Sequence, residues 1–345
     1  MSSEALDIVT ICFLDEMRML QMQARSIDRL MDPALLANYR IVINDSRRDA
    51  CVQFVETVIK PELDWLADRI KILLPKDFGV EVPEGGWKAQ QALKLAAARA
   101  VETPHYLILD AKNHFVRKVT HADLFDGALP RARIYQTSGK RTQWLANGLS
   151  YFGLDPAQAQ QLSGATVTPY LMVTRIVRDL VEAIEDMEKA PLIRYFSAEN
   201  DEKKSSEFFL YYAYIVSRIG PYDSIYSCTL RAQATLFTQH PRTDEAFEKI
   251  MRSAEKGVCY AFGVHRRRMG ALDKEQRKRI VKMWKKVGLI DGSEAEIFLT
   301  PYTPSNEIEP EELQSRLIID PQSRSVRKNR RNLFVDCIRR LLRKF

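Results

Sequence analysis

The chain has 345 residues, 46% of them hydrophobic and 28% charged, which is enough for one large or two small globular domains and excludes a disordered protein. Its net charge of +7 is concentrated in residues 324–345, which hold nine Lys or Arg and one Asp, and the nearly neutral remainder argues against a nucleic-acid binder. No apolar run reaches the roughly 20 residues that span a bilayer, no secretory signal is recognisable, and five scattered cysteines suit a reducing compartment, so we expect a cytoplasmic protein.

Strands and helices alternate through the first part of the chain. We expect strands at residues 7–14, 39–43 and 70–74 and a further strand from Tyr106. Helices are expected at residues 17–31, 50–59, 61–67 and 87–102. Strands that alternate with helices at this spacing predict an α/β fold with a mostly parallel central sheet flanked by helices.

The second part of the chain is expected to be mainly helical. Helices are predicted at residues 167–187, 207–219, 244–256 and 273–287. Ser205 or Ser206 can cap the second of these, and Thr243 can cap the third. Short strands are expected near residues 134–135 and 226–230.

The last residues form a basic tail, residues 324–345, after a linker at residues 301–323 that is rich in Pro, Glu and Ser. Apolar residues fall on one face of a helix in this tail, and basic residues fall mostly on the others. The apolar positions are Phe334, Ile338, Leu341, Leu342 and Phe345. A basic amphipathic C-terminal helix suits an anionic membrane surface, and the alternative is a helix docked on the body or on a partner protein.

The most informative stretch runs from Tyr106 to Val116. A buried-looking apolar run ends in one acid, Asp110, then breaks into short polar residues and resumes at Phe115. The carboxyl end of a core strand is where open α/β sheets bind ligands, and a charge there must be met by a metal, a cation or hydrogen bonds. The alternative role of Asp110 is to cap the turn, and His114 is expected at the surface or at a helix cap.

This stretch resembles the motif region of GT-A-fold nucleotide-sugar glycosyltransferases, in which a core strand ends in Asp-x-Asp. The motif corresponds to residues 109–117 here. Other segments resemble the family in the same order, namely residues 7–15, 40–45, 86–91, 206–211 and 262–265. The similarity covers roughly residues 5–290 and is greatest to a bacterial family of uncharacterised glycosyltransferase-like proteins.

The resemblance implies a GT-A-like domain over residues 1–300, with a nucleotide-binding half to about residue 130 and an acceptor half over residues 131–300. It implies transfer of a sugar from a nucleotide-diphosphate sugar to a glycan or lipid-linked acceptor in bacterial cell-envelope polysaccharide synthesis, by an enzyme at the inner face of the cytoplasmic membrane. The alternative is a noncatalytic nucleotide or glycan binding protein of the same fold. A nucleotidyltransferase would use a similar sheet, but no Gly-rich phosphate loop lies near the N-terminus.

The resemblance also implies roles for residues that bind the donor. Asp15 and Asp45 follow their strands and would lie near the nucleoside, although capping the next helix explains each nearly as well. Arg266 would clamp the diphosphate. Trp87 and Gln91 would border the sugar pocket.

One departure from the family puts the metal in question, because Lys112 stands where the second acid of the motif is found. Either Lys112 contacts the diphosphate directly in a metal-independent enzyme, or Asp110, Asn113 and His265 hold Mn²⁺ or Mg²⁺. Asp110 would in both cases face the diphosphate at the catalytic centre. Glu207 would bind the acceptor or act as general base, and the alternative is a favourable acid in the first turn of a helix.

Overall fold

The computed structural model describes residues 5–81, 86–161, 163–165, 167–197, 204–228, 232–238, 242–291 and 294–300. The chain forms two compact units, Met1–Thr303 and Pro304–Phe345. The second unit, with the expected linker and basic tail, lies outside the described residues.

A five-stranded sheet forms the centre of the first unit. Its strands are β1 (Leu6–Cys12), β2 (Leu36–Ile43), β3 (Ile70–Leu73), β4 (His105–Ile108) and β10 (Tyr170–Val173), in the order β10-β4-β1-β2-β3. β1 pairs in parallel with β2 and β4, and β2 pairs in parallel with β3, whereas β10 runs antiparallel to β4. The expected α/β fold with a mostly parallel central sheet is confirmed.

Helices make up most of the remaining regular structure. The longer ones are α1 (Met17–Leu30), α2 (Arg48–Phe54), α3 (Trp87–Ala96), α5 (Lys140–Tyr151), α6 (Thr174–Glu188), α8 (Glu207–Arg218), α9 (Asp244–Glu255) and α11 (Lys274–Lys286). Shorter elements are α4 (His121–Leu124), β6 (Phe125–Asp126), β7 (Leu129–Pro130), β8 (Tyr135–Gln136), β9 (Ser163–Gly164), α7 (Ile193–Ser197), α10 (Arg266–Met269) and α12 (Ala295–Leu299). Over the described residues, no helix combines the length and the apolar character needed to cross a membrane.

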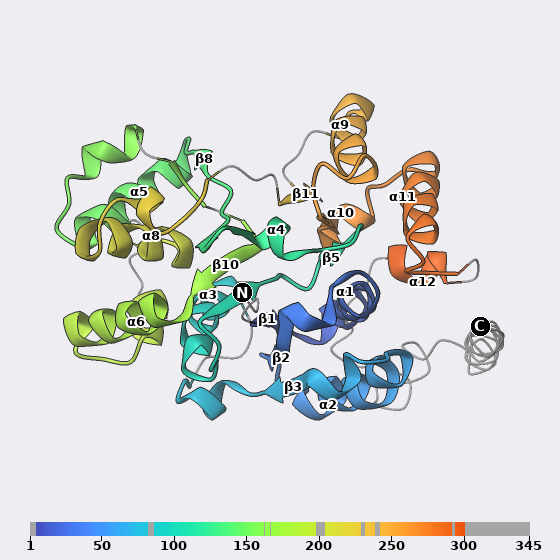
Figure 1. Ribbon diagram of the computed structural model, residues 1–345, viewed down its shortest axis with the longest axis horizontal. Helices are drawn as coiled ribbons and strands as arrows, with labels where there is room; N and C mark the ends of the chain where they lie inside the picture. Colours follow the sequence, from blue (N-terminus) through green and yellow to red (C-terminus); the bar gives the residue numbers. More distant parts are fainter. Residues whose placement is uncertain are drawn as a thin grey trace, which may run out of the picture. The chain divides into compact units, whose positions relative to one another are not determined.

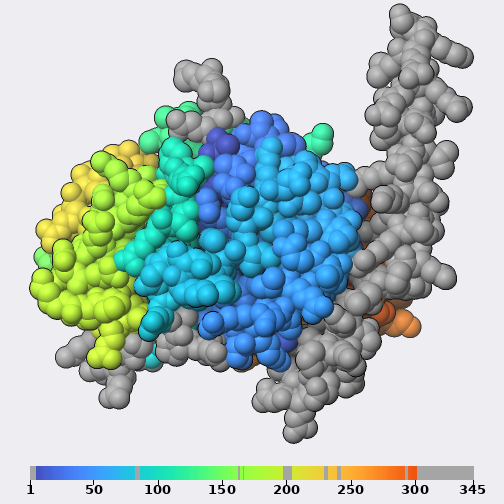
Figure 2. Space-filling view, turned by 90° about the horizontal axis from the view of Figure 1, so that it is seen from below, coloured from blue at the N-terminus to red at the C-terminus, as the bar shows by residue number. Residues whose placement is uncertain are grey.

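Both faces of the central sheet are covered by helices, and Figure 1 shows β1 between α1 and α3. On one face, Gln23 of α1 accepts hydrogen bonds from the hydroxyls of Thr10 (2.7 Å) and Tyr39 (2.5 Å). On the other face, Val9 and Ile11 pack in one apolar core with α3, α6 and α8. Alternate residues of β1 thus face different layers. Figure 2 shows the first hundred residues (blue to teal) beside α6 (yellow-green) on one side of the molecule.

A smaller three-stranded sheet joins the end of the motif stretch to two strands from the second half of the chain. Its strands are β11 (Gln233–Leu236), β12 (Ala261–Val264) and β5 (Asn113–Phe115). The prediction that His114 lies at the surface or at a helix cap is wrong, because His114 on β5 is 4% exposed and its Nε2 accepts from Trp284 Nε1 at 2.7 Å. Burial lowers the pKa of His114 to about 3, so the ring is a neutral core group.

The helical second half is confirmed, with two corrections. The helix expected at residues 167–187 starts only at Thr174, and Tyr170–Val173 is the strand β10 instead. Pro169 disfavours helical geometry only in the residue before it, and Tyr170–Val173 is a strand because it pairs antiparallel with β4. The helix α5 was not expected. Its Gly148 packs against the backbone of Phe209 on α8, where a Cβ would lie 3.1 Å from the Phe209 carbonyl oxygen.

Two further expectations are corrected at element ends. Residues 61–67 do not form a helix, since a 3-10 turn at Lys60–Glu62 is followed by extended backbone at Leu63. Of the strand expected at residues 226–230, the described residues 226–228 show only an isolated bridge between Ser227 and Arg131, and residues 229–230 lie outside the described residues.

Candidate functional site

Three parallel strands end at one edge of the central sheet, and an acid follows each of them. Asp15 comes after β1, Asp45 after β2 and Asp110 after β4. Because the carboxyl ends of parallel strands meet at the same edge, the three carboxylates predicted from the sequence lie on one side of the fold.

Asp45 ties the ends of β1 and β2 together. Its carboxylate accepts hydrogen bonds from the backbone N–H of Leu14 at 2.9 Å and of Arg47 at 2.8 Å, and the Arg47 Nε lies 3.2 Å away. Burial alone would raise the pKa of Asp45, but these donors hold it below its ordinary value. Asp45 is therefore an ionised group at the sheet edge, and it holds the turn before α2 without capping that helix, whose N-cap residue is Arg47.

Asp15 connects the first strand to the second half of the chain. Its Oδ2 accepts from Arg266 Nη1 at 2.7 Å, and its Oδ1 lies 3.8 Å from Arg47 Nη2. Arg266 begins α10 directly after β12, and its guanidinium lies 5.0 Å from the ring centroid of Phe13. The structure thus brings together Asp15, Asp45 and Arg266, which the sequence placed in one donor site.

Asp110 is held between two lysines. Lys94 Nζ lies 3.0 Å from Asp110 Oδ1, and Lys112 Nζ contacts Oδ2. Burial alone would raise the pKa of Asp110, but the two ammonium groups hold it well below its usual range. The sequence analysis missed Lys94, whose signal was a lysine on the buried face of an alanine-rich helix.

Glu207 shares Lys94 with Asp110. Lys94 Nζ lies 3.1 Å from Glu207 Oε1, and although burial lowers the pKa of Lys94, the two carboxylates raise it above its usual range. Glu207 begins α8, which Ser206 caps as expected by accepting from the backbone N–H of Phe209. Gln91 accepts from the backbone N–H of Glu207 at 3.4 Å. The expected catalytic pair, Asp110 and Glu207, is therefore linked through one buried cation.

Glu16 is a second residue that the sequence analysis missed. Burial raises its pKa to about 7, Lys112 and Arg266 oppose this shift, and Asp110 adds to it. A carboxyl group that titrates near neutral pH can accept or donate a proton under ordinary conditions. Its position next to Asp15 in the turn after β1 was the only sequence signal.

The residues expected to hold a metal do not fit a divalent cation. Both oxygens of Asp110 are engaged by lysines, and the buried Asn113 accepts from the Thr168 hydroxyl at 2.7 Å through its Oδ1. His265 Nδ1 lies 2.9 Å from the Thr238 hydroxyl and accepts from the backbone N–H of Arg267 at 3.3 Å. Across the described part of the chain, no three His, Cys, Asp or Glu side chains are grouped to hold a metal ion.

A cavity of about 240 Å³ opens at the ends of β2 and β3, next to Asp45. Asn44, Arg48 and Lys76 line it together with the Asp45 side chain. The Asn44 Nδ2 is buried and has no hydrogen-bond partner in the protein. A pocket with a few convergent polar groups at the carboxyl edge of a parallel sheet is a typical site for a small ligand.

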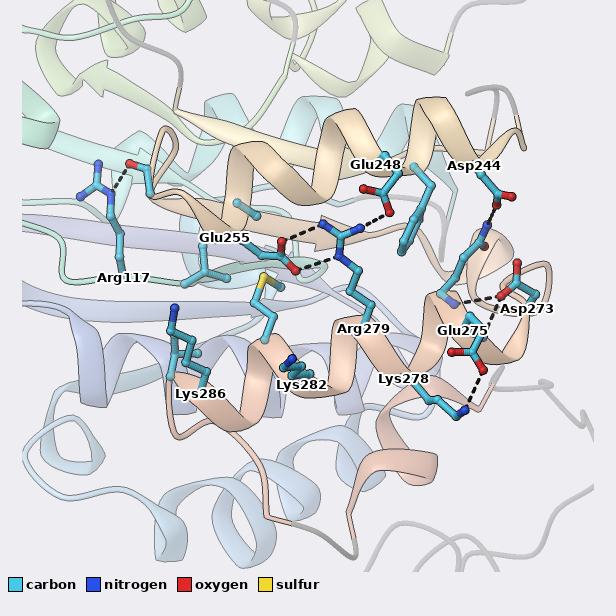
Figure 3. Close-up of a pocket in the computed structure, with 17 residues that line it drawn as sticks. Arg117, Asp244, Glu248, Glu255, Asp273, Glu275, Lys278, Arg279, Lys282 and Lys286 are labelled. Atoms are coloured by element: carbon cyan, nitrogen blue, oxygen red, sulfur yellow. Dashed lines mark hydrogen bonds and ion pairs between the residues drawn. The ribbon is translucent and has the colours of Figure 1, made fainter.

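A larger cavity lies elsewhere, in a groove of about 1160 Å³ between α9 and α11 (Figure 3). Arg279 occupies its centre and pairs with Glu248 and, at 2.8 Å, with Glu255, so it joins the two helices. None of the predicted site residues lines this groove. We therefore assign the candidate site to the sheet edge on its chemistry, although the cavities there are smaller.

Comparisons with known proteins give a family and distant structural relatives. A family described as "Family of unknown function (DUF6492)" matches residues 8–257, and no curated protein matches. An active-site mutant of LgtC is 10% identical over 84% of this chain and 99% of its own, with a TM-score of 0.46. The bifunctional glycosyltransferase WbbM is 10% identical over 82% of this chain and 52% of its own, with a TM-score of 0.42. Mouse xyloside xylosyltransferase 1 is 12% identical over 75% of this chain and 97% of its own, with a TM-score of 0.37. Similarities this distant do not identify an activity.

Proposed function

Because the chain belongs to the family of unknown function DUF6492, its activity has to be inferred from its own site, and we propose that it is a glycosyltransferase whose donor is a nucleotide-diphosphate sugar. The observation that carries this proposal is the meeting of acids and cations at the carboxyl edge of the parallel sheet. Asp15 pairs there with Arg266, and Asp110 pairs with Lys94 and Lys112. Such an edge binds ligands in open α/β folds, and cations aimed at one point suit a diphosphate.

The proposed enzyme works without a divalent metal. Lys112 and Arg266 would contact the diphosphate, and the carboxylates that pair with them in the free protein would give way to phosphate oxygens. Negative charge develops on the leaving diphosphate as the sugar departs, and cations already held in place stabilise that charge without reorganisation. The engagement of Asp110 by two lysines supports this mechanism over one through a metal.

The nucleoside end of the donor is assigned to the cavity at the ends of β2 and β3. Asp45 and the buried Asn44 Nδ2 supply an acceptor and an unsatisfied donor, which suits a ribose or a base. Its volume of about 240 Å³ suits part of a nucleoside, with the rest along the open edge.

Two carboxyl groups are candidates to assist the acceptor. Glu207 is buried against Lys94, whereas Glu16, with its pKa of about 7, already meets the requirement for a general base near neutral pH. We assign Glu207 to acceptor binding and retain Glu16 as the alternative base.

Thermal unfolding with a panel of nucleoside diphosphates tests the donor site. A ligand that binds the folded state raises the melting temperature by mass action, and we expect one nucleotide to do so equally in EDTA and in Mn²⁺. A shift that needs Mn²⁺ would overturn metal independence. The absence of any shift would overturn the donor site itself.

A noncatalytic nucleotide-binding protein is the second candidate, and the presence of Lys112 in place of the second acid of the motif favours it. The two candidates differ in turnover. Release of nucleoside diphosphate from the stabilising nucleotide sugar, measured with and without candidate acceptors, is expected only of the enzyme.

We also propose that the acceptor is a glycan or a lipid-linked glycan of bacterial cell-envelope polysaccharide synthesis, and that the basic residues of 324–345 bring the enzyme to an anionic membrane surface. The full chain should float with vesicles that contain phosphatidylglycerol and not with neutral vesicles. Equal flotation of a chain that ends at residue 323 would contradict the membrane role of the tail.

A further inference from the structure

Gln23 is a polar side chain in the middle of α1 that is completely buried, with 0% of its surface exposed. A buried amide is costly unless each of its polar groups finds a partner. Gln23 Nε2 donates to the backbone carbonyls of Asp110 at 2.8 Å and of Asn113 at 2.7 Å. Its Oε1 accepts from the hydroxyls of Thr10 on β1 and Tyr39 on β2. The amide therefore uses both of its donors and both of its acceptor positions.

These four partners fix the direction in which the Gln23 amide points. A backbone carbonyl can only accept a hydrogen bond, so only the nitrogen of the amide can face Asp110 and Asn113. The amide oxygen then faces the two hydroxyls, which can donate. Thr10 and Tyr39 belong to paired strands of the central sheet. The sheet thus holds the amide in place, and the amide holds the turn after β4.

The two carbonyls that accept from Gln23 lie at the two ends of the turn that carries Lys112. The turn also closes on itself, because the backbone N–H of Asn113 donates to the Asp110 carbonyl at 2.8 Å. Lys112 lies between these two residues, and its ammonium group contacts Asp110 Oδ2. The two bonds from Gln23 Nε2 therefore act as a clamp that limits how far the residues between them can move.

Ser26, three residues further along α1, extends this contact to β5. Its hydroxyl accepts from the backbone N–H of Phe115 at 2.9 Å and donates to the Gln23 carbonyl at 2.7 Å. Residues three apart lie on the same side of a helix, and α1 lies against β5 (Figure 1). Both side chains are buried, so neither can contact a ligand directly, and any effect on the donor has to act through the turn.

We propose that Gln23 is a positioning residue for the diphosphate site, which holds the Lys112 ammonium group and the Asp110 carboxylate where the leaving diphosphate meets them. Cations that are already in place stabilise developing charge without reorganisation, and a turn that moves loses part of that advantage. The positioning role rests on the proposed function, because it assigns the effect of Gln23 to the donor. The Gln23 clamp does not rest on that function, since it consists of contacts within the protein.

Gln23→Met tests the clamp, because methionine keeps the length of the side chain and removes its four hydrogen bonds. Gln21→Met is the matched control, since Gln21 lies on the same helix, is 1% exposed and donates to Glu62 at 2.9 Å instead of to the turn. Both variants lose a buried glutamine, so both should lower the melting temperature. Hydrogen exchange of the backbone amides of residues 110–115, followed by mass spectrometry, should become about tenfold faster only in Gln23→Met. Equal exchange in the two variants would overturn the clamp.

A shorter amide keeps the test decisive if Gln23→Met does not fold. Gln23→Asn retains a polar amide in the core, but its side chain is one methylene too short to reach both the hydroxyls and the turn. The same increase in hydrogen exchange over residues 110–115 is expected of it, and exchange as slow as in the native chain would overturn the clamp.

Titration calorimetry with the stabilising nucleoside diphosphate, in EDTA and at a temperature where the variants are folded, tests the positioning role. We expect Gln23→Met to bind about tenfold more weakly, which is what the loss of one charge-assisted contact costs, and Gln21→Met to bind as the native chain does. Faster exchange with unchanged nucleotide affinity would overturn the positioning role and leave the donor site standing. A native chain that no nucleoside diphosphate stabilises would refute the proposed function and the positioning role together, and the exchange result would still decide the clamp.

Discussion

A single carboxylate, Asp110, sits between two ammonium groups at the point where the resemblance calls for two acids. Lys112 and Lys94 together outweigh the cost of burying that charge, which is why the pKa of Asp110 is depressed. Two lysines against the single Asp110 carboxylate leave one positive charge in excess, and counting the Glu207 carboxylate as well removes that excess. An incoming diphosphate would meet lysine side chains that are already charged and already oriented.

Replacing Lys112 by Met should weaken binding of the stabilising nucleoside diphosphate about tenfold or more, because one charge-assisted contact is lost. Folding should persist, since Asp110 keeps its ion pair with Lys94. Titration calorimetry in EDTA measures the effect, and Lys118→Met supplies the control as an exposed lysine nearby in the chain. If the two variants bind nucleotide equally well, Lys112 is a solvated lysine and the metal-free mechanism fails.

Glu16 predicts a pH dependence of stability with a definite sign. Its pKa is raised from 4.5 to about 7 in the folded chain, so its stabilising contribution is complete below pH 4.5 and is lost as the pH rises to about 7. Relative to the native chain, Glu16→Gln should therefore gain about 1–3 kcal/mol between pH 4.5 and pH 8. Urea unfolding of both chains at several pH values gives this difference. A constant difference would mean that Glu16 titrates normally.

The site shows how far single residues can be predicted from a sequence. Asp15, Asp45 and Asp110 were predicted because each follows an apolar strand, and that pattern is local. Lys94 and Glu16 were missed because their chemistry comes from partners on other elements. The expected ligand role of Asn113 depended in the same way on a neighbour, Thr168, that no spacing rule identifies.

At the scale of elements, the pairing of β5 with β12 supports the turn that carries Lys112. A Cβ added at Gly263 on β12 would lie 2.9 Å from the Lys112 carbonyl oxygen and 3.2 Å from Asn113 Nδ2. Only a residue without a side chain lets the two strands approach this closely. The position of Lys112 is thus set partly by a glycine far away in the sequence.

Gly263→Ala should destabilise the protein by about 1–3 kcal/mol, because the added methyl group forces the backbone of the motif turn to move. The same movement should weaken nucleoside diphosphate binding. Gly148→Ala is the control, since its Cβ would crowd the Phe209 backbone instead. It should cost stability without a change in nucleotide affinity. Donor affinity that is unaltered in Gly263→Ala would show that the turn adapts freely.

Helices and strands were predicted correctly where the spacing of apolar residues was regular, and incorrectly where packing against other parts of the chain determined the structure. The helices α1, α9 and α11 begin and end within a residue or two of their expected bounds. The strand β10 was read as helix because Tyr170–Val173 is apolar without a period that distinguishes the two. It forms a strand because β4 offers an open edge for antiparallel pairing, which is information from elsewhere in the chain.

At the scale of the first compact unit, the order of the strands was beyond sequence reasoning. Alternating strands and helices predict a parallel sheet, but they do not say that β1 lies between β2 and β4. That order brings the ends of β1, β2 and β4 together and so creates the site. The return of the chain through β12 and α10 then adds Arg266 to Asp15 across 251 residues.

The early and late parts of this unit are also joined by one buried cation, Arg25. Its side chain is 2% exposed and pairs with Glu62 at 2.7 Å and with Glu294 at 2.9 Å, and it donates to the Leu289 carbonyl at 3.2 Å. Without Arg25 both carboxylates would lose their cation, although Gln21 Nε2 donates to Glu62 at 2.9 Å and the backbone N–H of Asp291 donates to Glu294 at 3.0 Å. Arg25 therefore links α1 to the segments around α12, and both ends of the unit should unfold together.

Arg25→Met should lower the free energy of unfolding by about 3–5 kcal/mol and the melting temperature by about 5–10 °C, because removing one partner of a buried ion pair leaves uncompensated charge. Calorimetry measures both quantities. Adding Glu62→Gln and Glu294→Gln to this variant should restore much of the loss, since the two carboxylates that faced Arg25 are then neutral amides. A loss below about 1 kcal/mol for Arg25→Met is what a solvated surface pair would give, and it would mean that the two ends of the unit are held together by apolar packing alone.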